Sequence, residues 1–340
     1  MIYADQRWIG DHGIGRFARH VLAGIDYCPV SIASHPASPL DTWRLAKELG
    51  KLTRNDLFFS PGYSTPFFCV SPFVFTIHDL NHIDRPENSN RTKRLYYATV
   101  LRRACYRATK ILTVSEFSRR RIVDWSGVPE EKVVNVRNGV DPAFNPGVAP
   151  YKLPFPYLLC VSNRKLHKNE FKTVEAFARA GLVDGIRLVF TGKPTPALTD
   201  CIERNHVAQR VHFVGLVPEA QLPSLYRGAE ALAFVSLYEG FGFPVLEAMA
   251  CGTPVVTAST SALPEVAGDA ALLVDPTSAD QIAEAMDRII SDTSLRERLR
   301  KSGVAQAARF PWKYTVDRAC ALLTRDTIQS VGKGPNCEAA

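Results

Sequence analysis

Six short apolar runs, separated by longer segments of helical character, make up most of the second half of the chain. Each run is too short for a core helix and long enough for a buried strand. Between two of them, the segment 168–181 places Phe171, Val174 and Phe177 on one helical face, and Gly181 follows as a helix stop. Strands that alternate with helices pair in parallel, so this half predicts a doubly wound α/β domain. The runs are 157–162, 187–191, 211–214, 231–235, 254–257 and 271–274.

The first half predicts another small α/β domain. Expected strands are 2–3, 56–59, 73–78, 110–114 and 133–136, with helices near 16–23, 91–108 and 118–126. Residues 141–156 hold five prolines and no hydrophobic periodicity, which is typical of a linker. We therefore predict an N-terminal domain of residues 1–148, a C-terminal domain of residues 149–328 and a flexible tail at 329–340. The last helix of the second domain is a candidate to pack back on the first.

Composition excludes several classes of protein. With 46% hydrophobic and 22% charged residues among 340, the chain is not intrinsically disordered. No apolar run approaches the roughly 18 residues of a membrane-spanning helix, and the first ten residues do not resemble a secretory signal. The eight cysteines are scattered without a metal-ligand spacing, so we expect reduced thiols in a cytoplasmic protein.

Positive charge is concentrated in the first half. Residues 1–150 hold 20 Lys and Arg against 14 Asp and Glu, whereas the whole chain has a net charge of +7. Seven of these basic residues, and no acidic one, lie between Ser89 and Ser115; in a helix, Arg91, Arg94 and Arg102 share a face. Two interpretations stay open: attraction to an anionic surface, either a membrane leaflet or a phosphorylated acceptor, and a solvated helix face. Nucleic acid is not expected as a partner, because aromatic-rich RNA-binding strands and recognition motifs are missing.

The most informative motif is YEGFGFPVLEAMACG at residues 238–252. A strand, a glycine-rich turn and a helix follow one another, with Pro244 suited to the first helical turn and Gly252 to the helix stop. The exposed amides of such a helix N-terminus bind phosphate. Glu239 and Glu247 bracket the turn and are expected at the carboxyl end of the sheet, where ligands of such folds bind. A purely structural turn is less favoured, because Glu247 lies within an apolar helix.

Two further segments combine strand ends with polar residues. SNRKLHKN at 162–169 would direct cations at a developing negative charge, with Lys168 the best candidate and Arg164 second, although a charged surface loop is equally compatible. GDHGIGR at 10–16 is either a loop that closes over a ligand or a turn. His78 ends an apolar run, where catalytic groups usually lie, but a lone histidine is more often structural.

Together these segments resemble the retaining GT-B glycosyltransferases of glycosyltransferase group 1, or family 4. The resemblance is strongest over 231–276 and extends through VSNRKLHKN, LTVSEFSRR, VRNGVD, FTIHDL and GIGRFARHVL. It implies two Rossmann-like domains facing across a cleft, with the nucleotide sugar on the C-terminal domain and most of the acceptor site on the N-terminal domain. Glu247 would then hold the ribose hydroxyls and Glu239 the transferred sugar. The amides of Phe241, Gly242 and Phe243 would meet the sugar and phosphates.

The resemblance assigns the remaining roles as well. Lys168 would neutralise the diphosphate, His78 would face the sugar or the incoming hydroxyl, and Gly13 and Gly15 would line the closing loop. The family's usual arginine ahead of the lysine is displaced here. Position 163 is Asn and position 167 is His, so whether Asn163 or Arg164 joins Lys168 on the donor is open.

The implied reaction is retaining hexosyl transfer, in which the departing phosphate receives the acceptor proton. No Asp-x-Asp motif is present, so we expect no metal and no other cofactor. VSNRKLHKN and FTIHDL are most similar to mannosyltransferases, which favours GDP-mannose as donor and a saccharide or lipid-linked acceptor in cell-surface polysaccharide synthesis. The chain would work in the cytoplasm, and the basic N-terminal domain makes the cytoplasmic face of the membrane a candidate location. A UDP- or ADP-sugar transferase, an epimerase or phosphorylase on a related fold, and a non-catalytic nucleotide-sugar-binding subunit are the alternatives.

Overall fold

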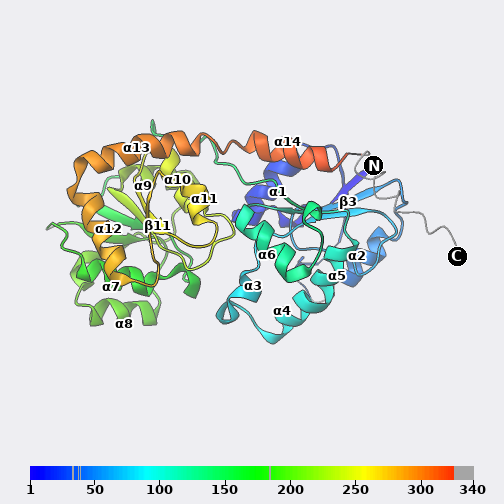
Figure 1. Ribbon diagram of the computed structural model, residues 1–340, viewed down its shortest axis with the longest axis horizontal. Coiled ribbons are helices and arrows are strands. Elements are labelled where there is room, and N and C mark those ends of the chain that lie inside the picture. The colour runs from blue at the N-terminus through cyan, green and yellow to red at the C-terminus, as the bar shows by residue number, and fades with distance from the viewer. Residues whose placement is uncertain (33, 37, 39, 184, 325–340) are drawn as a thin grey trace. The chain divides into compact units, whose positions relative to one another are not determined.

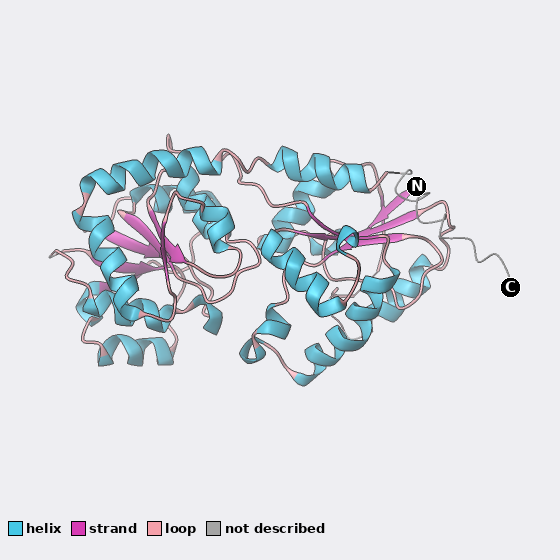
Figure 2. Cartoon of the chain, viewed as in Figure 1, coloured by secondary structure: helices cyan, strands magenta, loops and turns pink. Residues whose placement is uncertain are grey.

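The computed structural model describes residues 1–32, 34–36, 38, 40–183 and 185–324. The described residues divide into two compact units, which Figures 1 and 2 show (unit 1, Met1–Gly139 with residues 312–324; unit 2, Val140–Pro311). The boundary expected near residue 148 lies inside unit 2. The expected tail at 329–340 lies outside the described residues.

Helix α14 (Trp312–Leu322) belongs to unit 1, in agreement with the expectation that the last helix packs back on the first domain, so the second unit ends at Pro311 rather than at 328. The Trp312 ring stacks on His20 of α1 (Gly13–Ala23) with 4.1 Å between ring centroids. A Cβ at Gly24 would lie 2.2 Å from Cγ1 of Val316, and one at Gly139 would lie 2.4 Å from the Trp312 nitrogen. Close packing against these glycines therefore places the final helix on unit 1.

In the described residues, unit 1 carries a parallel six-stranded sheet in the order β2-β1-β3-β4-β5-β6. The strands are β1 (Ile2–Ala4), β2 (Cys28–Pro29), β3 (Leu57–Ser60), β4 (Phe73–Thr76), β5 (Lys110–Thr113) and β6 (Val133–Asn135). The main helices are α1 (Gly13–Ala23), α2 (Asp41–Leu49), α3 (Asn81–Asp84), α4 (Arg91–Tyr96), α5 (Arg102–Arg107) and α6 (Glu116–Ser126).

Unit 1 differs from the sequence-based expectation in several elements. Strand β2 and helices α2 and α3 were not predicted: β2 has only two residues, α3 has only four, and the exposed Trp43 interrupts the apolar stripe of α2. The helix expected over 91–108 is continuous but contains a π-helical turn, Tyr97–Leu101, between α4 and α5.

Unit 2 carries a second parallel sheet, in the order β12-β11-β10-β7-β8-β9 among the described residues. Each of the six apolar runs overlaps one strand. The strands are β7 (Tyr157–Cys160), β8 (Arg187–Phe190), β9 (Val211–Phe213), β10 (Ala231–Phe234), β11 (Val255–Ala258) and β12 (Leu272–Val274). The helices are α7 (Glu170–Arg179), α8 (Pro196–Arg204), α9 (Leu222–Gly228), α10 (Phe243–Ala250), α11 (Leu263–Ala267), α12 (Ala279–Ser291) and α13 (Thr293–Ala307).

The strand order of unit 2 positions its functional edge. The chain passes from β7 outward to β8 and β9, then returns to pair β10 with β7 on the other side. Connections therefore leave the carboxyl ends of β7 and β10 in opposite directions, and such a switch point is where ligands of doubly wound folds bind. All four residues of β7 and of β10 are buried, as strands covered by helices on both faces must be. The predicted α/β class with two Rossmann-like domains is thus confirmed for each unit.

Within the described part of the chain, no helix is both long and apolar enough to cross a membrane. The seven cysteines that the structure describes form no disulfide, and Cys337 lies outside the described residues.

Candidate active site

The glycine-rich loop of unit 2 connects β10 to α10 at the carboxyl edge of the sheet. Gly242 precedes the helix with φ +115°, a conformation that disfavours residues with a Cβ. A Cβ there would also lie 2.7 Å from Cδ2 of Leu263, which is fully buried. Phe241 is buried and meets the rings of Phe243 and Phe310 at 5.3 and 6.0 Å between centroids. These contacts hold the first turn of α10, and its amides, at the end of β10.

Glu247 is a buried carboxylate with a specific partner. It lies in the second turn of α10 with 4% of its surface exposed, and the hydroxyl of Tyr226 donates to its Oε2 at 2.8 Å. Tyr226, on α9, is fully buried, and its carbonyl accepts from Thr253 Oγ1 at 2.6 Å. A buried carboxylate requires such hydrogen bonds, so Glu247 is not the solvated side chain of a structural turn. Sequence reasoning missed Tyr226, because its spacing is that of an ordinary core residue.

Lys168 and Glu239 come together from two different motifs. Lys168 Nζ lies 2.7 Å from Oε1 of Glu239, with 14% and 13% of the two side chains exposed. The ammonium also lies over the Phe234 ring, 5.1 Å from its centroid. Leu237 N donates to the His167 carbonyl at 2.8 Å, which joins the two loops through the backbone as well. The structure therefore brings Lys168 and Glu239, both predicted site residues, together beside the switch point of the sheet.

Asn169 is a second residue that sequence reasoning missed. It precedes α7 with φ +61°, and its Nδ2 donates to the carbonyls of Val235 and Pro276 at 3.0 and 2.7 Å. One amide group thus ties together the segments that follow β7, β10 and β12. Its signal in the sequence is an asparagine at a helix start, where the left-handed conformation is tolerated.

Arg164 is held by groups other than Lys168 and Glu239. Its guanidinium forms an ion pair with Glu170 and donates to the carbonyls of Thr191 and Lys193. It also lies 5.4 Å from the ring centroids of Phe190 and Phe213. Asn163 beside it is exposed. The structure therefore does not bring Arg164 to the Lys168 ammonium, and donor binding by Arg164 or Asn163 stays a prediction.

His78, in unit 1, follows the carboxyl end of β4 and is buried. Its Nε2 lies 2.9 Å from the Pro61 carbonyl, and the Phe17 ring meets the imidazole edge-on at 5.0 Å. Burial lowers the pKa of His78 to about 4, opposed by the Pro61 hydrogen bond and aided by the charge of His12. Because a carbonyl can only accept, Nε2 carries the proton of the neutral ring, and Nδ1 is a hydrogen-bond acceptor.

Gly13 and Gly15 lie in the first turn of α1, which begins three residues before the predicted start at 16. The expectation that they line a loop is therefore corrected. His12 Nδ1 accepts from Gly15 N at 3.0 Å, as a helix cap. A Cβ at Gly15 would lie 2.2 Å from the Gly10 carbonyl oxygen, so glycine is required by this close backbone approach. Phe17 of the same helix, whose ring centroid lies 5.0 Å from that of His78, places α1 beside the imidazole.

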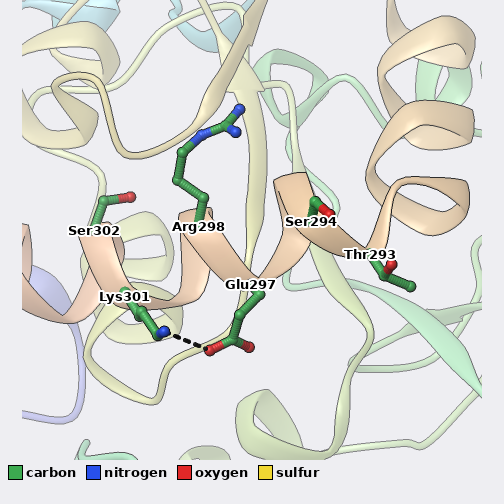
Figure 3. Close-up of a pocket in the computed structure, with 6 residues that line it drawn as sticks. All are labelled: Thr293, Ser294, Glu297, Arg298, Lys301 and Ser302. Atoms are coloured by element: carbon green, nitrogen blue, oxygen red, sulfur yellow. Dashed lines mark ion pairs between the residues drawn. The ribbon is translucent and has the colours of Figure 1, made fainter.

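A surface hollow on α13 is not part of this site. Thr293, Ser294, Glu297, Arg298, Lys301 and Ser302 line it, as Figure 3 shows. All six come from one helix, and Lys301 pairs with Glu297 at 3.6 Å. Without a second element that contributes groups, this is a solvated helix face.

The chain folds into two doubly wound units, and one of them carries a glycine-rich loop and a lysine–glutamate pair at its switch point. This combination defines the class of GT-B glycosyltransferases. Solved structures share the fold. Anabaena HepE in complex with UDP-glucose superimposes with a TM-score of 0.72 at 18% identity, over 95% of this chain and 98% of that one. WaaG, a glycosyltransferase involved in lipopolysaccharide biosynthesis, gives 0.69 at 17% identity over 95% and 99%.

Comparison of the amino-acid sequence with known families identifies the family of this chain. The model for glycosyl transferases group 1 matches residues 149–306, and that for glycosyltransferase family 4 matches residues 7–144. O-antigen chain mannosyltransferase B of Escherichia coli is 31% identical over 71% of this chain and 67% of its own length. The chain therefore belongs to the group 1 glycosyltransferases, and the predicted resemblance is confirmed. The serotype-specific mannosyltransferase WbdA of E. coli is 25% identical, but the match covers only 29% of its length.

Proposed function

We propose that the chain is a retaining mannosyltransferase that uses GDP-mannose and extends a saccharide or lipid-linked acceptor of a cell-surface polysaccharide. The observation that carries the transfer reaction is the Lys168–Glu239 contact, 2.7 Å long, beside the helix that bears the buried Glu247. The names of two matched relatives, both mannosyltransferases, support the sugar.

The proposed roles follow from the contacts. Glu247, oriented by Tyr226, accepts hydrogen bonds from the ribose hydroxyls. The amides at the start of α10 and the Lys168 ammonium bind the diphosphate, because a helix N-terminus and a lysine both favour negative charge. Lys168 then exchanges its Glu239 partner for the diphosphate, and Glu239 turns to a hydroxyl of the sugar.

The proposed transfer balances without an added base. The acceptor oxygen bonds to the anomeric carbon on the face from which the diphosphate leaves, the bond from that carbon to the phosphate oxygen breaks, and the acceptor proton passes to the diphosphate. Positive charge fixed at Lys168 stabilises the leaving group, which is the role otherwise taken by a metal ion. Neutral His78 is available as a hydrogen-bond acceptor on unit 1. We therefore propose that the reaction needs no metal.

The test is calorimetric titration of the purified chain with GDP, UDP, ADP and CMP and their sugar conjugates, with and without EDTA, followed by turnover with a mannose-containing acceptor. We expect selective binding of GDP-mannose, unchanged by EDTA, and an α-linked product by NMR. Glu247→Gln should abolish binding, whereas Glu284→Gln, at an exposed glutamate of the same unit, should not.

Each other result changes a defined part of the proposal. Selective binding of UDP or ADP and their sugar conjugates would support the transferase assignment and contradict GDP-mannose as the donor. Donor conversion to free monosaccharide without acceptor indicates an epimerase, and binding without turnover indicates a non-catalytic subunit. Loss of activity in EDTA contradicts the metal-free mechanism, and no nucleotide binding contradicts the transferase itself.

A further inference from the structure

Unit 1 displays a group of exposed apolar side chains that the transfer reaction does not use. We call the exposed Leu40, Trp43, Phe68 and Val70, together with the half-buried Phe67, the aromatic patch. Trp43 is 51% exposed, Phe68 52% and Val70 69%. The Trp43 ring stacks on Phe67 with 4.3 Å between centroids and meets Phe68 edge-on at 6.3 Å. Clustered aromatic rings that remain in water mark an interaction surface, whereas single exposed apolar residues do not.

The patch is held in place rather than carried on a loose loop. Phe67 N donates to the Thr42 carbonyl of α2 at 3.2 Å, and Thr42 Oγ1 donates to the Thr65 carbonyl at 2.6 Å. From α5, Arg107 Nη1 donates to the Phe67 carbonyl at 2.7 Å. Two helices therefore fix the segment 65–70 with its aromatic rings outward.

Exposed basic side chains lie on the two helices that hold the patch. Arg44 and Lys47 are exposed on α2, and Arg103 and Arg107 are exposed on α5. Arg103 lies over the Phe67 ring, 4.9 Å from its centroid. Within α2, residues 65–70 and α5, all of which the structure describes, the two carboxylates are Asp41, which is buried and paired with Arg7, and Glu48, which is paired with Lys51. The outward surface is thus both apolar and positively charged.

We propose that the aromatic patch docks unit 1 on an anionic lipid bilayer. Tryptophan and phenylalanine favour the headgroup region, and arginine and lysine beside them attract acidic lipids. A surface with this charge would repel a basic protein partner, and it lacks the base-reading motifs of a nucleic-acid site. The inference deepens the proposed function. It rests on that function in one respect, because a lipid-linked acceptor would lie at such an interface.

Vesicle co-sedimentation tests this inference with the full chain. Vesicles of phosphatidylcholine alone are compared with vesicles that contain about 30 mol% phosphatidylglycerol, at about 0.1 and 0.5 M salt. The variants are Trp43→Ser with Phe68→Ser, and the control Leu216→Ser, which alters a 93% exposed leucine of unit 2. We expect the wild type and the control to bind the anionic vesicles, more weakly in high salt. The double variant should bind at least about tenfold more weakly, because two aromatic side chains no longer insert.

Tryptophan fluorescence supplies a second readout. Of the four tryptophans, all within the described residues, only Trp43 is exposed, so its emission should shift to shorter wavelength on anionic vesicles and the shift should vanish in Trp43→Phe. Equal vesicle binding by wild type and double variant, or equal binding to neutral vesicles, would overturn the inference. So would a Trp43 response to soluble glycan but not to lipid. GDP-mannose titration of the same variants separates the two proposals, because the patch variants should retain donor binding even where vesicle binding is lost.

Discussion

Lys168 Nζ lies 2.7 Å from Oε1 of Glu239, although 71 positions separate the two residues in the chain. The lysine assigned to the donor's diphosphate is thus ion-paired with the carboxylate assigned to its sugar. Both side chains are largely buried, so the removal of either leaves the other without its partner in a poorly solvated site. In the proposed mechanism, an anionic donor takes the place of the Glu239 carboxylate beside Lys168.

Replacement of Lys168 should therefore affect the leaving group most. We expect Lys168→Ala to lower kcat/KM by about 10²–10³-fold, the usual cost of one group that stabilises developing negative charge. Steady-state kinetics with the nucleotide sugar measure this effect. Lys165→Ala removes an exposed lysine from the same segment and should change kcat/KM by no more than about twofold. Equal losses of kcat/KM in Lys168→Ala and Lys165→Ala would show that the segment acts only through its overall positive charge.

Tyr226→Phe should weaken donor binding without slowing the chemical step. The variant loses the 2.8 Å hydrogen bond to Glu247 Oε2, and a bond to a charged acceptor contributes about 1.5–3 kcal/mol. We expect the donor Kd to rise about tenfold or more, while kcat stays within about twofold. The control is Tyr157→Phe, in which a buried hydroxyl loses a 2.8 Å bond to the Leu225 carbonyl instead. An equal rise in Kd for the control would contradict a positioning role specific to Glu247.

Gly242→Ala should destabilise the fold more than Gly185→Ala. Both glycines have positive φ, +115° and +93°, so each alanine carries a conformational cost of about 1–2 kcal/mol. Only the Cβ at position 242 meets the buried Leu263, which adds about 1–3 kcal/mol of overpacking. Urea unfolding measures both free energies. Similar values for the two variants would mean that the loop relaxes without strain.

His78 should make the free energy of unfolding depend on pH. Burial lowers its pKa to about 4 in the folded chain, below about 6.5 in the unfolded chain. Between these values the unfolded state binds more protons, so the free energy of unfolding falls as pH decreases from about 6.5 to 4, by up to about 3 kcal/mol. Denaturant unfolding of wild type and His78→Gln at several pH values measures the difference. The variant should lose less stability over this interval, and parallel curves would show that other groups account for the acid sensitivity.

The sequence by itself determined the two α/β units, the glycine-rich turn before α10 and the residues beside it. These features are local: short apolar runs, helical periodicity and glycine positions depend on neighbours within a few residues. The helix α2 escaped detection because Trp43 faces solvent, where a hydrophobic pattern predicts a polar residue.

Only the tertiary structure decided which distant groups meet. Arg164 and Lys168 lie four residues apart, and the sequence ranked them first and second, Lys168 ahead, as cations for a diphosphate; in the structure Arg164 pairs with Glu170, whereas Lys168 pairs with Glu239. Tyr226 contacts Glu247 for the same reason. Such partners are brought together by the strand order and by side-chain packing across the sheet, which no local pattern in the sequence records.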